Sequence, residues 1–296
     1  MKRLRQIKLI GFMLAGNGLI WLSLAILAAI LCGLIWRSYA IFGHCSLSEI
    51  LFSQTWMPTQ GKFGLAAFIT GTFMVSGLAM ILAVPISLLT AIYLSEYIPL
   101  RLSKFLQSII DLLAGIPSVI YGIWGILVII PLIKNHLAPL AGSAGTGYSL
   151  LAGGIVLAVM VFPVIIQISL EVFRSIPFEI REVSMALGAT QWETIKRVIL
   201  RKAMPGLVAA NILGLSRALG ETMAVMMVVG NVAKIPHSLF DPAYPLPALI
   251  ANTYGEMMSI PLYDSAVMTA ALVLLMIVVI FNILARIVLK NLRIGY

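Results

Sequence analysis

Two residues of opposite charge stand four positions apart inside a long apolar stretch. At this spacing Arg217 and Glu221 would share one face of a helix. A guanidinium donates two parallel hydrogen bonds to an oxyanion, so Arg217 could bind an anion while Glu221 holds it when the site is empty. The alternative is a structural ion pair that locks helices together. Both interpretations stay open from the residues alone.

The surroundings of these charges must be polar or shielded. Each charge near the centre of a bilayer costs about 2.5–3.5 kcal/mol to insert. The ten Leu, Ile and Val residues between 205 and 232 return only about 3–6 kcal/mol. Ser87, Ser118 and Thr222 could donate hydroxyl hydrogen bonds to an anion, although isolated hydroxyls in membrane helices more often bond to the backbone.

The composition places the chain in a membrane. Of its 296 residues 61% are hydrophobic and only 10% are charged, against about 25% charged in soluble domains. Soluble globular proteins, disordered proteins and disulfide scaffolds are therefore excluded. The net charge of +9 is scattered between apolar runs, which predicts membrane topology and no nucleic-acid partner. Cys32 and Cys45 have no metal-binding or redox spacing.

Apolar runs long enough to cross the hydrocarbon core predict an all-α membrane protein that forms a single transmembrane domain over 1–296. The six predicted transmembrane helices are 9–36, 64–95, 105–133, 149–170, 205–232 and 265–286. Asp111 interrupts the third, where a structural pair at the membrane interface is the favoured role. Pro85, Pro117 and Pro163 lie inside predicted spans and predict either ordinary curvature or hinges along a pathway.

The basic residues predict which side each loop faces. With six spans, the links 37–62, 134–148 and 233–264 share the external side with four basic residues: Arg37, Lys62, Lys134 and Lys234. The other side has fifteen: Lys2, Arg3, Arg5, Lys8, Arg101, Lys104, Arg174, Arg181, Lys196, Arg197, Arg201, Lys202, Arg286, Lys290 and Arg293. The positive-inside rule then puts both termini in the cytoplasm.

The internal link 171–204 is too long for a simple connector and reads as two short helices. Pro177 suits the start of the first, which runs to about Leu187. Gly188 supplies a left-handed stop. Thr190 and Glu193 then form a capping box that begins the second helix. The pattern predicts a helix–Gly–helix elbow suited to docking on another protein, or else an amphipathic segment at the membrane interface without a partner.

The elbow resembles the EAA loop of ABC importer permeases of type I. Glu182 and Gly188 have the spacing of that motif, and Val198-Ile-Leu200 matches its ending. Val183 and Ser184 replace its two alanines, and Arg201 stands where proline is usual. The resemblance implies that this helix inserts into a groove of an ATP-binding subunit. The residues it assigns to coupling are Glu182, Ala186, Leu187, Gly188 and Ala189.

Three further stretches extend the resemblance over most of the chain. They are Trp56 to Gly64, Asp111 to Gly122 and Arg217 to Thr222. Together with the elbow they are similar to the phosphate ABC importer permeases of the PstC type. The resemblance implies a bacterial inner-membrane subunit with a phosphate pathway at Arg217, Glu221, Ser118 and Thr222. The implied partners are a PstA-type permease, two ATP-binding subunits, an extracytoplasmic phosphate-binding protein and membrane lipid.

Enzyme motifs are missing from the sequence. It contains no P-loop, so ATP should be bound by the partner subunit, and no catalytic residue or cofactor is expected. His44, His136 and His237 fall in separate loops, which does not favour a metal site. The alternatives are a permease for another oxyanion such as molybdate or sulfate, a stand-alone secondary transporter or channel, or a structural or signalling subunit.

Overall fold

The computed structural model describes residues 2–143, 145–255, 260 and 262–294, with side chains between Gly18 and Lys290 in those ranges. Its α-helices are α1 Lys2–Phe42, α2 Leu47–Phe52, α3 Ala66–Glu96, α4 Leu100–Ala114, α5 Ser118–Trp124, α6 Ile130–Leu132, α7 Ala138–Leu140, α8 Leu150–Arg174, α9 Phe178–Ala186, α10 Gln191–Thr194, α11 Leu200–Gly220, α12 Met223–Val228, α13 Leu246–Thr253 and α14 Tyr263–Ile294. The π-helical segments η2 Gly125–Ile129, η3 Ile133–Leu137 and η4 Ile195–Ile199 continue the α-helices beside them. Strands β1 Trp56–Met57 and β2 Lys62–Phe63 pair antiparallel around the 3₁₀ turn η1 Pro58–Gln60.

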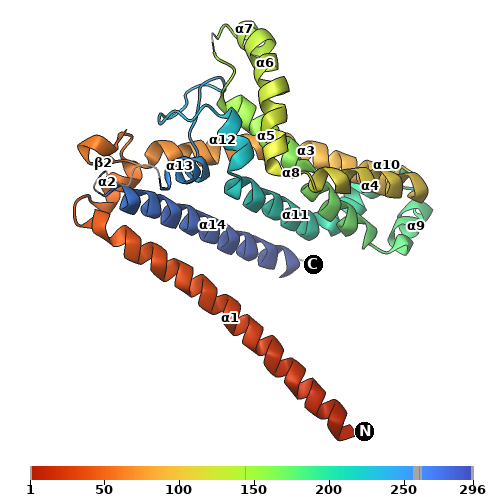
Figure 1. Cartoon of the computed structure of the whole chain (residues 1–296). Coiled ribbons are helices and arrows are strands. Elements are labelled where there is room, and N and C mark those ends of the chain that lie inside the picture. The colour runs from red at the N-terminus through yellow and green to blue at the C-terminus, as the bar shows by residue number, and fades with distance from the viewer. Residues whose placement is uncertain (1, 144, 256–259, 261, 295–296) are drawn as a thin grey trace.

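The described residues include six helices that are long and apolar enough to cross a membrane, as predicted. They are Gly18–Phe42, Ala66–Glu96, Ser118–Leu140, Leu150–Arg174, Gln191–Gly220 and Tyr263–Lys290. Figure 1 shows α3, α8, α11 and α14 gathered into a bundle. The N-terminal end of α1 diverges from this bundle, and α6 and α7 project away from it (Figure 1).

The centre of the bundle is the contact between α3 and α8. Val75 and Ala79 of α3 pack with Leu157 and Val161 of α8, and all four side chains are buried. Gly154 allows the two helices to approach, because a Cβ there would lie 2.6 Å from Leu78 Cδ2. Close approach through small residues increases van der Waals contact, which is a main source of helix association in membranes.

A second core lies at the end of the bundle that carries the β1–β2 hairpin and α13. The Trp56 ring meets the rings of Phe63 and Phe68 edge to face, with centroids 5.7 and 5.1 Å apart. The backbone N–H of Leu65 donates to the carbonyl of Ile50 at 2.7 Å. Thr72 Oγ1 of α3 accepts a hydrogen bond from the N–H of Leu246 at 2.9 Å, which ties α13 to the bundle.

The predicted bounds of the third span, 105–133, are wrong. α4 ends at Ala114 and is capped by Gly115, and Pro117 precedes α5. Proline has no N–H to donate and disfavours helical backbone at the residue before it, here Ile116. The membrane-length helix therefore begins at Ser118 and extends to Leu140, which shifts the start of the predicted external link 134–148.

The predicted fifth span and the predicted elbow boundary also need correction. The second short helix of the 171–204 segment is not separate, because α10, η4 and α11 run on from Gln191 to Gly220. The fifth span thus starts well before Pro205, which lies inside α11. It also ends earlier than the predicted 232, because the backbone leaves the helix after Gly220 and α12 is a separate short helix.

Candidate functional site

The intramembrane charges lie on either side of a helix end. Arg217 is in the last turn of α11, whereas Glu221 follows it with extended backbone, φ −72° and ψ 128°. Glu221 Oε1 accepts a hydrogen bond from the N–H of Ala224 at 3.3 Å and so caps α12. The prediction that Arg217 and Glu221 share one helix face is therefore wrong. Among the described residues they form no ion pair.

The two side chains also face different surroundings. Glu221 is partly buried and lines a narrow internal crevice with Ser76 of α3 and Val225 of α12. Arg217 is exposed on the isolated chain. An intramembrane arginine without a carboxylate partner needs another polar environment in the bilayer.

Helix α5 packs against α12, the short helix that follows the break after Gly220. A Cβ at Gly122 would lie 2.5 Å from Met227 Sδ and 3.3 Å from Ala224 Cα, so only glycine permits this approach without displacement. The Tyr121 hydroxyl donates to the carbonyl of Leu113 at 2.7 Å, which joins α5 to the end of α4. Ser118 is the first residue of α5 and is partly buried.

The hydroxyls of Thr222 and Ser87 and the carboxylate of Asp111 all form hydrogen bonds within the chain. Thr222 Oγ1 donates to the carbonyl of Gly220 at 3.3 Å across the helix break. Ser87 is buried and its hydroxyl donates to the carbonyl of Phe162 at 3.5 Å. Asp111 lies on α4 and accepts a hydrogen bond from Gln167 Nε2 at 2.6 Å. Its partner is therefore an amide on α8, and no described ion pair involves Asp111.

Both cysteines are free thiols in the structure. Burial raises the pKa of the Cys45 thiol above its usual value, and the negative charge of Glu49 raises it further. Because the thiolate is the reactive form, Cys45 is a weaker nucleophile than an ordinary exposed cysteine.

The elbow has the local structure that the sequence predicts. α9 ends at Ala186, and Gly188 has a φ of +86°, which L-residues with side chains rarely adopt. Thr190 Oγ1 accepts from the N–H of Glu193, while the Glu193 carboxylate accepts from the N–H of Thr190. This confirms the capping box at the start of α10.

The outward face of α9 and the turn after it combine apolar and acidic residues. Leu187 is 85% exposed, and Phe178 and Val183 are 63% and 60% exposed. Of the residues assigned to coupling, Glu182, Ala186, Leu187 and Gly188 are exposed and Ala189 is partly buried. Large apolar side chains gathered on a surface outside the hydrocarbon core are typical of a protein–protein contact.

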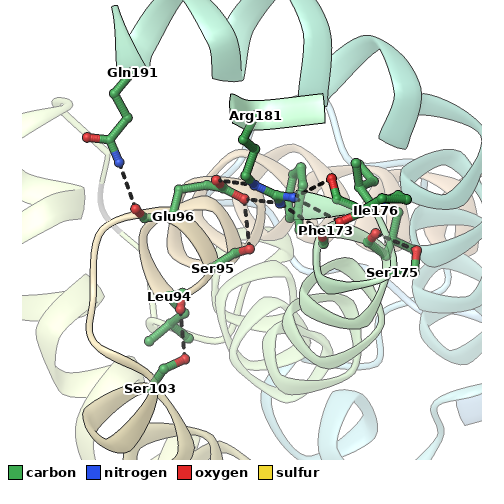
Figure 2. Close-up of polar contacts among 11 residues, drawn as sticks. Leu94, Ser95, Glu96, Ser103, Phe173, Ser175, Ile176, Arg181 and Gln191 are labelled. Carbon is green, nitrogen blue, oxygen red and sulfur yellow. Dashed lines mark hydrogen bonds and ion pairs between the residues drawn. The ribbon is translucent and has the colours of Figure 1, made fainter. Parts of the chain in front are cut away.

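The opposite side of α9 carries an ion pair that the sequence reading missed. Figure 2 shows Arg181 of α9 reaching the carboxylate of Glu96 at the end of α3, at 3.0 Å to Oε2 and 2.7 Å to Oε1. The same guanidinium donates to the carbonyls of Phe173 and Ile176 at 3.0 and 2.9 Å. Glu96 closes a long apolar run, but 85 residues separate it from Arg181. Nothing in the sequence around either residue therefore predicts that the two form a pair.

A line of polar contacts continues from this ion pair along α4 and α8. Ser103 Oγ donates to the carbonyl of Leu94 at 2.7 Å. Arg174 donates to Ser103 Oγ at 2.7 Å and to Gln107 Oε1 at 2.8 Å. The Gln167–Asp111 bond lies further along the same two helices. These contacts hold α4 against α8.

A protein-family comparison identifies the wider group. Residues 83–294 match the family described as binding-protein-dependent transport system inner membrane component. The matched region includes the elbow, α11 and the break after Gly220.

Individual relatives agree with the family match. The phosphate transport system permease protein PstC of Haemophilus influenzae is 37% identical over 285 residues, which cover 90% of this chain and 89% of the relative. The Bacillus subtilis protein described as probable ABC transporter permease YqgH is 42% identical over 240 residues, covering 80% of this chain and 76% of the relative.

Solved structures support the same fold at lower identity. The MetNI methionine ABC transporter in an inward-facing conformation has a TM-score of 0.60 at 21% identity, covering 77% of this chain and 95% of the other. A bacterial alginate ABC transporter has a TM-score of 0.55 at 20% identity, covering 90% and 95%. The chain therefore belongs to the family of binding-protein-dependent transport system inner membrane components and is the membrane-spanning permease subunit of an ABC transporter.

Proposed function

We propose that this permease forms half of the pathway of an ATP-driven importer of inorganic phosphate. The observation that carries the proposal is its similarity to PstC permeases, 37% identical over 90% of this chain for the Haemophilus influenzae protein. The other half of the pathway comes from a PstA-type permease. Two ATP-binding subunits and an extracytoplasmic phosphate-binding protein complete the complex.

Arg217 is the proposed anion-binding residue of the pathway. Its side chain is exposed on the isolated chain and has no carboxylate partner among the described residues. An unpaired charge in a membrane is unfavourable unless it faces a partner subunit or a water-filled path. Its planar group can donate two parallel hydrogen bonds to a phosphate oxygen pair. Ser118 and Thr222 are the proposed neighbours of Arg217 on the same path, and Glu221 contributes to the path by holding the backbone break beside Arg217.

The proposed role of Glu221 differs from the role that its spacing suggested, which was to hold Arg217 when the site is empty. It caps α12 through Ala224 and lines the internal crevice, so it holds the backbone break in shape instead of neutralising Arg217. Arg217 is then left with its full charge available to an anion. This arrangement favours the pathway interpretation over a structural ion pair.

The exposed face of the elbow is the proposed contact with the ATP-binding subunit. Phe178, Val183 and Leu187 are too exposed and too apolar to face water in the assembled protein. Glu182, Ala186, Gly188 and Ala189 complete this surface. The stop at Gly188 separates α9 from α10, which presents α9 as a short helix at the edge of the bundle (Figure 1).

The elbow and both termini are proposed to be cytoplasmic. The excess of basic residues on the side of the elbow supports this orientation. In Figure 1 the N-terminal end of α1 and the C-terminal end of α14 also lie toward the end of the molecule that carries α9, away from the β1–β2 hairpin. The hairpin and α13 would then face the phosphate-binding protein.

The proposed substrate can be tested with the reconstituted complex. The chain is co-expressed with its neighbouring subunits, purified, and placed in liposomes with the binding protein. We expect phosphate to stimulate ATP hydrolysis and to be taken up, while molybdate and sulfate do neither. Uptake of molybdate or sulfate in place of phosphate would contradict the phosphate assignment. Uptake without any ATPase subunit would contradict the importer class.

A further inference from the structure

The ion pair between Arg181 and Glu96 is largely buried and fully hydrogen-bonded. The side chains are 12% and 6% exposed, and the guanidinium meets the carboxylate through two parallel bonds. The remaining donors of Arg181 reach the carbonyl of Phe173 in the last turn of α8 and that of Ile176 in the turn after it. Carbonyls at the end of a helix lack partners within it, so Arg181 satisfies them and complements the helix dipole.

The contacts around this pair join four elements. Arg181 belongs to α9, Glu96 ends α3, and the two carbonyls belong to the end of α8 and the turn after it. Gln191 of α10 donates to the backbone carbonyl of Glu96 at 2.7 Å (Figure 2). The elbow is therefore attached directly to both helices of the central α3–α8 contact.

The attachment lies opposite the exposed face of α9. Arg181 and the buried Ser184 face the bundle, and Ser184 shares a hydrogen bond with Thr194 at 2.9 Å. Val183 and Leu187 remain outside on the opposite side, whereas the exposed ring of Phe178 lines the cavity beside Arg181. A force applied to the outer face would therefore pass to α3 and α8 through contacts that already exist.

We infer that Arg181 and Glu96 are positioning residues that couple the elbow rigidly to α3 and α8, so that displacement of α9 by the ATPase moves these helices. This inference rests on the proposed docking of α9. A buried ion pair often adds no more stability than apolar residues of the same size. Its bidentate geometry does fix orientation, whereas an apolar contact would allow α9 to slide over the bundle.

An exposed ion pair on α10–η4 provides the matched contrast. Arg197 and Glu193 approach to 4.0 Å, with side chains 75% and 42% exposed. A single exposed pair of this kind contributes about 0–1 kcal/mol and is screened by salt. Arg197→Gln removes one charge of an ion pair that lies close to the elbow but outside the link.

The experiment measures phosphate uptake and ATP hydrolysis in the same proteoliposomes of the complete transporter. Glu96→Gln, Arg181→Lys and the double variant Glu96→Met with Arg181→Met are compared with Arg197→Gln. The double variant leaves no buried charge unpaired. A cavity of about 650 Å³ beside Glu96 and Arg181 lets water reach the freed carbonyls.

We expect the variants of the link to bind the ATPase subunit normally, because the outer face of α9 is unchanged. The phosphate transported per ATP hydrolysed should fall by about fivefold or more, the lower end of typical coupling between sites. Arg197→Gln should keep the normal ratio. A loss of complex yield with an unchanged ratio would show a purely structural role and overturn the inference.

Different results would contradict the proposed function and the proposed coupling role of Arg181 and Glu96. An unaltered complex that takes up no phosphate would contradict the proposed function. An unaltered complex that couples phosphate uptake to ATP, with the same ratio in the double variant, would contradict only the link.

Discussion

Individual charged residues in this permease differ most in how they are partnered. Arg181 has every donor group directed at an acceptor, whereas Arg217 has no carboxylate partner among the described residues. A fully satisfied guanidinium fixes structure, and an unsatisfied one is available to a ligand. The spacing of Arg217 and Glu221 indicated a pair, but the helix end at Gly220 separates them. Residue type alone could not distinguish these cases.

Substitution of Arg217 tests the anion site at the residue scale. Arg217→Lys keeps the charge but loses the bidentate geometry, and Arg217→Ala loses both. Charged hydrogen bonds contribute about 1.5–3 kcal/mol, so we expect the apparent affinity for phosphate to fall about ten- to a hundredfold. Complex yield should stay normal, because no described carboxylate loses a partner. Uptake assays in proteoliposomes measure the effect.

The double variant Arg217→Ala with Glu221→Ala distinguishes the two interpretations of these charges. A structural ion pair would predict recovery of transport, since removal of both partners is often tolerated. The structure predicts no recovery, because Glu221 caps α12 instead. Glu221→Gln is the matched control, since its amide oxygen can still accept from Ala224. Wild-type uptake by the double variant would contradict the anion site.

Helix boundaries follow local chemistry where the signal is strong and fail where the apolar pattern continues through a backbone break. The capping box at Thr190 and the stop at Gly188 involve neighbouring residues, so the sequence was sufficient to predict them. The breaks at Pro117 and after Gly220 lie inside long, mainly apolar segments that were each predicted as one continuous span. In a membrane such breaks are stabilised by neighbouring helices, and the hydropathy of a segment does not predict those contacts.

Gly188 tests the elbow at the scale of the element. A Cβ at this position would meet no atom within 4 Å, so any effect of substitution comes from the positive φ. Gly188→Val should resist this conformation, displace α10 relative to α9 and reduce phosphate uptake. Gly188→Asn should retain most uptake, because asparagine tolerates left-handed backbone. Equal uptake by both variants, at equal amounts in the membrane, would remove the elbow geometry from the mechanism.

At the scale of the whole molecule, the sequence predicted the fold class, the six spans and the family, because all three depend on apolar runs and local motifs. It did not predict the contact of Arg181 with Glu96 or the packing of α5 against α12. Both contacts join segments that are distant in sequence. The sequence of each segment alone is that of an ordinary helix end or helix face, so it does not indicate the contact. Half of the proposed pathway also belongs to a second permease. In this chain alone, the proposed site around Arg217 is therefore incomplete.

The orientation of the chain follows from where its basic residues and its elbow lie. A single cysteine is introduced at Thr59 in the β1–β2 hairpin, at Ser238, or at Arg197 in η4 beside the elbow, after both native cysteines are changed to Ser. All three positions are exposed. The positive-inside rule predicts that Thr59→Cys and Ser238→Cys react with an impermeant maleimide in intact cells, and Arg197→Cys only after permeabilisation. The reverse pattern would place the elbow outside the cell, where no ATP-driven subunit could reach it.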